Sequence, residues 1–543
     1  MASDGWSAPR PDGNDTRNGL GSVPASQSED NTLSTSLFKS TAVVGQMTLV
    51  SRILGFMRDM IIARLVGAGI AADAFFVAFK IPNLFRRLFA EGAFSQAFIP
   101  VLTEYKSTGD QDRVIDLVGA TAGALALVLF GVVTLGILAA PYFIAVFAPG
   151  FTQDAVRWDL ATLLLRITFP YLLFISITAL FGSLLNTYGR FAIPAVTPAL
   201  LNIALIVAAV FAAPRFDEPV VALAIGVFAG GLLQFAMQFA AVLRLGVLRR
   251  LSFGFAHPGV RQILKLMAPA IFGVSVAQIN LMIDTMIASL LETGSISWLY
   301  YSDRLVEFPL GVFGIALATV VLPSLSRHHA GGRSENFSAT LDWALKLTLL
   351  ISLPAACALA LLAQPMLSAL FQYGQLVERD VVMAGRSLVA YSAGLTAFIL
   401  VKILAPGYFA RQDTKTPVKI GIIAMVTNVA LNLILVWPLA HAGLALATSL
   451  SAFLNAGLLL RGLLADGTYR PGPGWGIYAL RVLGAVIVMC TALVMLNAEQ
   501  SVWTASDALT RAWMLAQLVV VGAASYFAAA FVFGIRWHAA PRD

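Results

Sequence analysis

Hydrophobic runs of about 20 residues follow one another from Leu37 to Phe533, and only short polar connections separate them. The hydrocarbon core of a bilayer is about 30 Å thick, and a helix crosses it with about 20 apolar residues. Because that core holds no water, each span must pair its own backbone groups, and the runs lack the alternating pattern of barrel strands. The sequence therefore predicts an all-α polytopic membrane protein.

Composition supports this class and separates the N-terminal segment from the rest. Of the 543 residues, 58% are hydrophobic and 12% are charged, whereas soluble domains carry about 25% charged residues. Residues 1–36 differ because they are rich in Ser, Asp, Asn and Gly and contain no apolar segment of a signal peptide. We predict that residues 1–36 form a disordered polar tail.

We predict fourteen transmembrane helices, and the charges of their connections test that number. The spans lie at about 40–65, 72–96, 114–147, 158–186, 194–213, 219–243, 263–291, 296–325, 339–363, 383–409, 416–438, 442–463, 476–497 and 507–534. With a cytoplasmic N-terminus, the outer connections carry only Arg157, Arg215 and Arg379, while the inner segments carry most other loop Lys and Arg residues. Inner loops are the basic ones in membrane proteins, so both termini are expected in the cytoplasm.

One spacing recurs along the chain and indicates an internal duplication. "GAFSQAFIPVLTEY" resembles "IALATVVLPSLSRH", and these stretches contain Pro100 and Pro323. The separation between these two prolines equals the separation between Pro194 and Pro417. We therefore expect two pseudo-symmetric six-helix lobes, residues 37–250 and 251–470, followed by two extra transmembrane helices and a short tail in residues 471–543.

Charged side chains inside the predicted spans need a physical reason. A charge at mid-bilayer costs about 2.5 to 3.5 kcal/mol, so such groups must face a wet cavity or one another. The first span, "SRILGFMRDMIIAR", is the most charged of them. Candidate cavity residues lie on the first, second and eighth spans, where helical spacing aligns many of them: Arg52, Arg58, Asp59, Asp73, Lys80, Arg86, Arg87, Glu91, Asp303, Arg304 and Glu307.

The excess of arginine in this set favours an anionic substrate. Guanidinium groups pair phosphate oxygens through two parallel hydrogen bonds. A structural alternative stays open, in which Arg86 and Arg87 extend from helix ends toward water and Asp59 and Asp303 are counter-ions of the neighbouring arginines. A cation-coupled drug exporter also stays open, although its cavity would be dominated by carboxylates.

The sequence contains no recognisable motif for a disulfide, a metal site or nucleotide hydrolysis. The two cysteines, Cys357 and Cys490, lie in apolar runs, the five histidines fall in connections or at helix ends, and no GxxxxGK[ST] loop occurs. The outer connections at about 148–157 and 371–382 lack histidine, which disfavours a membrane-embedded transferase. We expect a transporter rather than an enzyme, with no cofactor, no bound metal and no nucleic-acid partner.

Three stretches carry a resemblance to a known family: "SRILGFMRDMIIARLVGAGIAADAFFVAFKIPNLFRRLFAEGAFSQAFIPVLTEYK", "TGSISWLYYSDRLVEFPLGVFGIALATVVLPSLS" and "LAPGYFARQDTKTPVKI". They resemble the MurJ (MviN) family of lipid II flippases, in the multidrug/oligosaccharidyl-lipid/polysaccharide exporter superfamily. The resemblance implies export of lipid II, the undecaprenyl-diphosphate-linked peptidoglycan precursor, across the bacterial inner membrane for cell-wall biogenesis. It also implies a polyprenyl groove at the last two spans, and we expect contacts with membrane lipids. The sequence does not choose between the membrane potential and a coupled cation as the energy source. Substrate-binding residues would be Arg52, Arg58, Asp59, Arg86 and Arg304.

Overall fold

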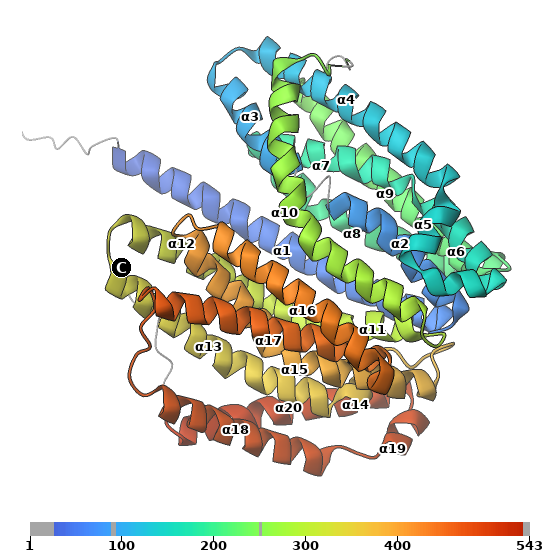
Figure 1. The fold of residues 1–543 in the computed structure, drawn as a ribbon, viewed down its shortest axis with the longest axis vertical. Helices are drawn as coiled ribbons and strands as arrows, with labels where there is room; N and C mark the ends of the chain where they lie inside the picture. The colour runs from blue at the N-terminus through green and yellow to red at the C-terminus, as the bar shows by residue number, and fades with distance from the viewer. Residues whose placement is uncertain (1–25, 88–93, 249–251, 253, 536–543) are drawn as a thin grey trace, which may run out of the picture.

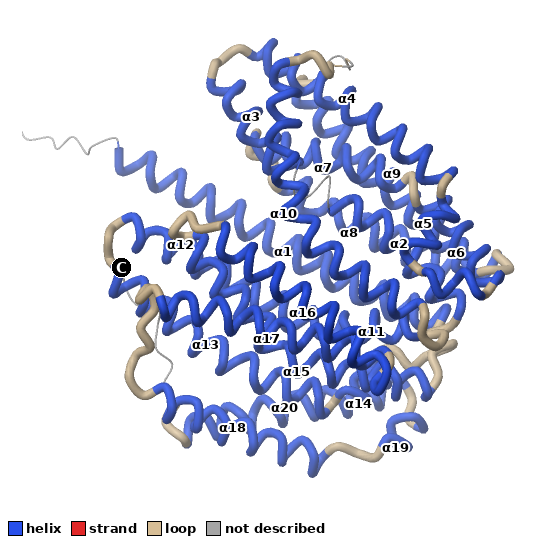
Figure 2. The backbone as a smooth tube through the Cα atoms, in the orientation of Figure 1, coloured by secondary structure: helices blue, strands red, loops and turns tan. Residues whose placement is uncertain are grey.

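The fold is entirely helical in the part of the chain that the computed structural model describes, which is residues 26–87, 94–248, 252 and 254–535 (Figures 1 and 2). The N-terminal half contains α1 (Ser26–Val66), α2 (Ile70–Arg86), α3 (Ser95–Ser107), α4 (Gln111–Leu138), α5 (Ala140–Phe147), α6 (Ala155–Thr168), α7 (Tyr171–Thr187), α8 (Ala192–Val207) and α9 (Pro219–Leu245).

The C-terminal half contains α10 (Pro258–Ser289), α11 (Ser295–Pro309), α12 (Ile315–Ala330), α13 (Ser334–Leu361), α14 (Ala363–Leu370), α15 (Glu378–Phe409), α16 (Lys415–Leu439) and α17 (His441–Ala465). It is followed by α18 (Trp475–Leu496), α19 (Gln500–Ala505) and α20 (Ala508–Val532). Short π-helical segments, Ala208–Ala212 and Leu310–Gly314, continue α8 and join α11 to α12.

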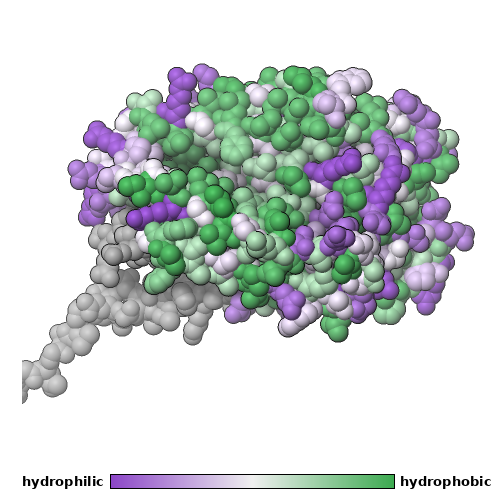
Figure 3. Space-filling view, turned by 90° about the horizontal axis from the view of Figure 1, so that it is seen from below, coloured by the Kyte–Doolittle hydropathy of each residue, from purple (hydrophilic) through white to green (hydrophobic). Residues whose placement is uncertain are grey.

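Eleven helical stretches of the described residues are long and apolar enough to cross a membrane, which confirms the predicted class of polytopic helical membrane protein. They coincide with eleven of the fourteen predicted spans. The other three predicted spans fall on α1, on α2 with the first two residues of α3, and on α10, and residues 88–93 of the second of these lie outside the described residues. On the face that carries α18 and α20, hydrophobic residues cover most of the surface and hydrophilic residues gather toward the two ends (Figure 3).

The predicted tail, residues 1–36, overlaps the beginning of the first helix. Helix α1 begins at Ser26, so residues 26–36 are helical, while residues 1–25 lie outside the described part of the chain. The physical reason is that extending a helix that has already formed adds one hydrogen bond for each residue fixed. A polar composition therefore does not end a helix by itself.

Helix boundaries recur at a constant offset along the two halves. α4 spans residues 111–138 and α13 spans residues 334–361, so both ends of these helices have the separation that relates Pro100 to Pro323. α5 and α14, at 140–147 and 363–370, have the same offset at both ends. The first residues of α8 and α16 are also related by it, and so are the last residues of α1 and α10. The proline spacing in the sequence thus extends to whole helices.

The two halves share one large hydrophobic core at one end of the molecule, and two further clusters lie at the other end. Phe75 and Phe151 of the first half pack in one cluster with Trp298, Tyr301 and Phe371 of the second half. The first of the two further clusters lies on α3, α4, α7 and α9 and includes Ile263 of α10, and the second lies on α12, α13, α15, α16 and α17. The halves are therefore closed against each other at the end where α2 meets α11.

Helices α18 and α20 pair with each other and attach to the second half through α13 and α14 (Figure 1). Tyr526 donates a hydrogen bond to the Leu350 carbonyl, with an O–O distance of 2.6 Å. The buried Arg511 donates to the carbonyls of Ser368 and Gln372 at the end of α14. These contacts fix the C-terminal pair to α13 and α14.

Candidate functional site

A charged cluster connects α1 to α11 at the place where the halves meet. The buried Arg58 pairs with its neighbour Asp59, with 2.6 Å between Arg58 Nη2 and Asp59 Oδ1. Asp59 Oδ2 lies 3.0 Å from Nε of Arg304, which belongs to the other half. We call Arg58, Asp59 and Arg304 the central triad. One carboxylate, 1% exposed, thus neutralises two arginines from opposite halves.

Tyr300 and Asn202 complete the hydrogen bonding of the triad. The Tyr300 hydroxyl donates to Asp59 Oδ1 at 2.9 Å and accepts from the guanidinium groups of Arg58 and Arg304. Asn202 on α8 accepts from Arg58 Nη1 at 3.0 Å. Because each guanidinium is held by several acceptors, its position is fixed at the junction.

Local helix geometry explains why α11 presents three polar groups here. Residues 300, 304 and 307 are spaced by four and three, so they lie on one helical face. Glu307 accepts from Arg304 Nη1 at 2.7 Å. The ring of Tyr300 stacks on Phe76 of α2, with 4.0 Å between centroids. The triad therefore lies directly against the shared hydrophobic core.

Of the two candidate counter-ions, Asp59 pairs with Arg304 and Asp303 does not. Asp303 precedes Arg304 in the sequence, but the structure pairs Arg304 with Asp59 and Glu307. Successive residues on a helix point about 100° apart, so Asp303 faces elsewhere. Asp303 is exposed and lies within electrostatic range of Lys80 on α2.

A second polar group surrounds Lys80. Its ammonium donates to Thr285 Oγ1 of α10 at 2.6 Å, so this contact also joins the two halves. The neighbouring residue, Asp284, accepts from Asn432 of α16 at 2.7 Å. Lys80 and Asp303 are exposed although both lie inside predicted spans. Because charges inside a membrane are stable only where water or a partner reaches them, we infer a hydrated space between the halves at this group.

The remaining predicted residues occupy separate positions. Arg52 is exposed and its guanidinium covers the backbone at Gly311, where a Cβ atom would collide with it. Arg86 is partly buried and donates to Asn83 of its own helix. Arg87 is exposed at the end of α2, and Glu91 lies outside the described residues.

Asp73 has a buried position that the spacing did not predict. Its carboxylate accepts from the backbone N–H groups of Gly294 and Ser297, at 2.7 and 3.0 Å, and from the Ser297 hydroxyl at 2.6 Å. It therefore satisfies the free N–H groups at the beginning of α11 from the opposite half of the molecule. Asp73 is 2% exposed and lies at the closed end rather than in the hydrated space.

Sequence reasoning missed four groups of this site: Tyr300, Asn202, Asp284 and Thr285. Tyr, Asn and Thr are uncharged and also occur at ordinary contacts between transmembrane helices, so their types alone carry little signal. Asp284 was the detectable one, because an acidic residue inside an apolar span is rare. Among the described residues, no three His, Cys, Asp or Glu side chains gather in a way that could hold a metal ion.

Comparisons with known proteins agree on one family. Residues 62–512 match the family described as "Lipid II flippase MurJ". A "Probable lipid II flippase MurJ" of Vibrio cholerae serotype O1 is 49% identical over 514 residues, covering 93% of this chain and 98% of that protein. The "Lipid II flippase MurJ" of Burkholderia cenocepacia is 43% identical over 507 residues, covering 92% and 98% of the two chains.

Solved structures have the same fold. One described as "Lipid II flippase MurJ, inward closed conformation" is 27% identical with a TM-score of 0.78, covering 91% of this chain and 98% of that one. An inward-facing multidrug resistance MATE transporter of the MOP superfamily has a TM-score of 0.66 at 12% identity, covering 79% and 98%. The family predicted from the sequence is confirmed, and the chain, a multi-pass bacterial membrane protein, belongs to the MurJ lipid II flippase family.

Proposed function

We propose that this protein moves lipid II from the cytoplasmic to the periplasmic leaflet of the bacterial inner membrane. The observation that carries the proposal is the central triad, which holds two arginines from opposite halves at the closed end of a hydrated space. A diphosphate needs bidentate cationic partners, and guanidinium groups supply them. The names of the relatives supply the substrate.

The proposed topology has fourteen spans with both termini in the cytoplasm. α1, α2 with α3, and α10 add to the eleven apolar stretches, and the constant offset between helices of the two halves supports two lobes of six spans. The lobes are residues 37–250 and 251–470, and residues 471–543 add the last two spans. In this orientation the shared core lies on the periplasmic side, so the structure corresponds to a form that is open inward.

The triad suggests how substrate changes the contact between the lobes. Without substrate, Asp59 neutralises Arg58 and Arg304, and Glu307 binds Arg304 as well. A diphosphate that binds the guanidinium groups competes with Asp59 for the same donors. Because the Asp59–Arg304 pair joins the lobes, its replacement weakens the closed end and allows the outward-open form.

The other candidate charges set the electrostatic potential along the path that lipid II takes. Arg52, Lys80, Arg86 and Arg87 add to the positive potential of the hydrated space, while Asp303 and Glu307 reduce it. Asp73 acts at the closed end through its contacts with α11. The energy comes from the membrane potential, about 2.3 kcal/mol for each charge per 100 mV, or from a coupled cation. Transport needs no covalent chemistry.

A drug exporter is the second candidate, because MATE transporters have the same fold. The sequence identity to that MATE transporter is 12%, so the similarity shows a shared fold and nothing about the substrate. Depleting the protein from cells distinguishes the two functions. We expect lipid II to accumulate with unchanged chemical structure while drug sensitivity stays the same. Unchanged lipid II levels with increased drug sensitivity would contradict the proposal.

A further inference from the structure

A short segment of the second half binds the turn that follows α1. The segment consists of Gly374, Gln375 and Leu376, in the connection between α14 and α15, and we call it the strap. The backbone N–H of Gln375 donates to the Arg64 carbonyl at 3.0 Å, so the main chain of one half binds the main chain of the other. Leu376 is 4% exposed and belongs to the shared hydrophobic core. The strap is therefore part of the closed end.

Two glycines permit the close approach of these chain segments. Gly67 has a φ of +59° and Gly374 has a φ of +62°, in the left-handed region that favours glycine. A Cβ atom on Gly67 would lie 2.5 Å from the Gln375 carbonyl oxygen, and a Cβ atom on Gly374 would collide with the Arg64 carbonyl oxygen. Each glycine thus leaves the space that the backbone of the opposite half fills. A larger residue at either position would push the strap away from the turn.

The second half also binds the same turn through α11. The Tyr301 hydroxyl donates to the Gly67 carbonyl at 2.6 Å. Phe371, directly after α14, is fully buried, and its ring lies 5.4 Å from that of Tyr301 and 5.8 Å from that of Phe56, measured between centroids. The turn after α1 is therefore held between α11 and the strap. The halves can separate at this end only if the strap is released.

Arg511 of α20 binds the chain just before the strap. It is 7% exposed, and its guanidinium donates to the Gln372 carbonyl at 2.8 Å and to the Ser368 carbonyl at 3.2 Å. The same guanidinium donates to the Thr504 carbonyl of α19 at 2.8 Å. One side chain thus joins the C-terminal helix pair to the segment from which the strap extends.

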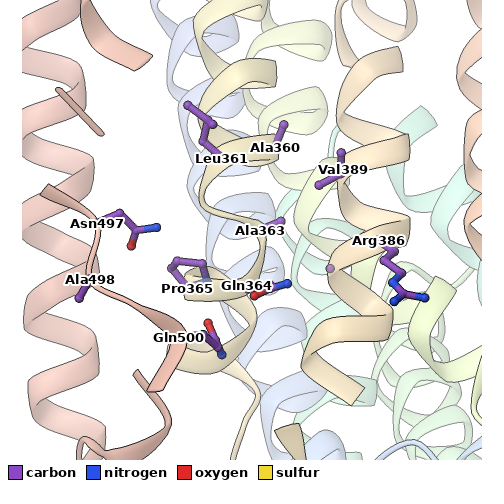
Figure 4. Close-up of a pocket in the computed structure, with 11 residues that line it drawn as sticks. Ala360, Leu361, Ala363, Gln364, Pro365, Arg386, Val389, Asn497, Ala498 and Gln500 are labelled. Atoms are coloured by element: carbon purple, nitrogen blue, oxygen red, sulfur yellow. The ribbon is translucent and has the colours of Figure 1, made fainter. Parts of the chain in front are cut away.

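The packing of the C-terminal part against α14 is incomplete nearby. A pocket of about 260 Å³ lies between them, and its lining includes Gln364 and Pro365 of α14 and Asn497 and Ala498 of the linker after α18 (Figure 4). Close packing does not fix the linker at this place. Polar contacts such as those of Arg511 therefore have a larger influence on how the C-terminal part is held against α14.

We propose that the strap locks the closed end and that Arg511 positions it, so the C-terminal helix pair controls how easily the halves separate. The hydrogen bond between Gln375 and Arg64 breaks each time the closed end opens. Loss of the Arg511 contacts frees the chain before the strap and favours opening. This inference rests on the proposed alternation between two forms and not on the substrate, so it can fail while lipid II transport stands.

Labelling of a buried cysteine measures release of the strap in the purified full-length protein, without lipid II. Leu376→Cys, made in a variant without Cys357 and Cys490, should react slowly with a water-soluble maleimide because this position is buried in the shared core. Adding Gly67→Ala should raise the rate about tenfold, which corresponds to about 1.4 kcal/mol. Val377→Cys, at a position that is 55% exposed, should react equally fast with and without Gly67→Ala.

Two glycine variants separate the collision from other effects. Gly69→Ala changes the same turn at a position where nothing lies near the added Cβ atom, and Gly332→Ala imposes a similar φ, +65°, in open space. Neither should change the labelling of Leu376→Cys. A rate that Gly67→Ala leaves unchanged, or that Gly332→Ala raises equally, would overturn the role of the strap.

The same cysteine tests the role of Arg511. Arg511→Gln should raise the labelling rate of Leu376→Cys, and Arg511→Lys should raise it less, because an ammonium still donates to a carbonyl. The lysine variant also covers the case in which Arg511→Gln does not fold. The matched control is Arg481→Gln, since Arg481 of α18 donates to the Gly534 carbonyl within the C-terminal part. Equal rates in the Arg511→Gln and Arg481→Gln backgrounds would overturn the positioning role of Arg511.

Discussion

Asp59 of α1 and Arg304 of α11 form an ion pair across the two halves of the molecule, with 3.0 Å between Oδ2 and Nε. The same carboxylate binds Arg58, so two guanidinium groups from different halves depend on one acidic side chain. The proposed substrate would compete with this carboxylate. The predictions below separate its electrostatic role from a merely structural one.

Replacing either arginine of the triad with alanine should abolish transport. Arg58→Ala leaves the buried Asp59 with one partner fewer, and breaking such a pair costs about 3–5 kcal/mol. Lysine should restore partial function because it keeps the charge and loses the bidentate geometry. The measurement is complementation of a depletion strain, with the amount of membrane protein checked by blotting.

Double variants test the structural alternative for the same arginines. Arg58→Ala/Asp59→Ala and Arg304→Ala/Glu307→Ala remove each arginine together with an acidic partner. We expect both to remain inactive at normal protein levels, because the diphosphate would still lack its cationic partners. Full activity of both doubles would mean that these residues serve only as scaffold.

Tyr300→Phe should weaken the closed end without removing any charge. The phenol makes hydrogen bonds with all three residues of the triad, and losing them should cost about 1–3 kcal/mol. The unfolding temperature in detergent should fall, and transport should be reduced but not lost. Tyr373→Phe is the control, because its hydroxyl binds only a carbonyl of its own chain segment, Ala369. Equal effects of the two substitutions would contradict the bridging role of Tyr300.

The proposed orientation can be read from thiol labelling in a variant without Cys357 and Cys490. Asp217 precedes α9 and Ser334 begins α13, and both are exposed. A membrane-impermeant reagent added to the periplasm should label Asp217→Cys and leave Ser334→Cys unlabelled until the cells are opened. The reverse pattern would invert the proposed topology.

The native cysteines test whether the C-terminal pair moves with the second half. Cys357 on α13 and Cys490 on α18 pack against the same hydrophobic cluster, although they lie far apart in the sequence. Because α18 and α20 attach through α13 and α14, a covalent link between these thiols should leave transport unchanged. Cells treated with a short thiol crosslinker should retain activity at full crosslinking. A loss that depends on both cysteines would mean that α18 moves relative to α13.

Much of the fold follows from the sequence because bilayers impose a simple rule. Long apolar runs specify helices, and the repeated spacing of Pro100 and Pro323 anticipated the equal offsets of α4 and α13. The start of α1 was not predictable from composition, since a helix continues through polar residues once it has formed.

The site was only partly predictable, for geometric reasons. Charges such as Arg58, Asp59 and Arg304 are conspicuous in apolar helices, so they could be identified as candidates. Their partners depend on how helices from two halves approach each other, and the sequence contains no direct record of that approach. Asp73 illustrates this limit, because helical spacing aligned it with Lys80 while the structure uses it to cap α11.

The most direct test of the proposed transport of lipid II is to measure in which leaflet of the membrane lipid II lies. Spheroplasts would be exposed to an added enzyme that cleaves lipid II and cannot cross the membrane, and the cleaved fraction would be quantified in three strains. The strain with the wild-type protein should expose lipid II to cleavage. Depleted cells and cells with Arg58→Ala should accumulate intact lipid II that is protected until the membrane is opened. Equal cleavage in all three strains, at matched lipid II synthesis, would contradict the account.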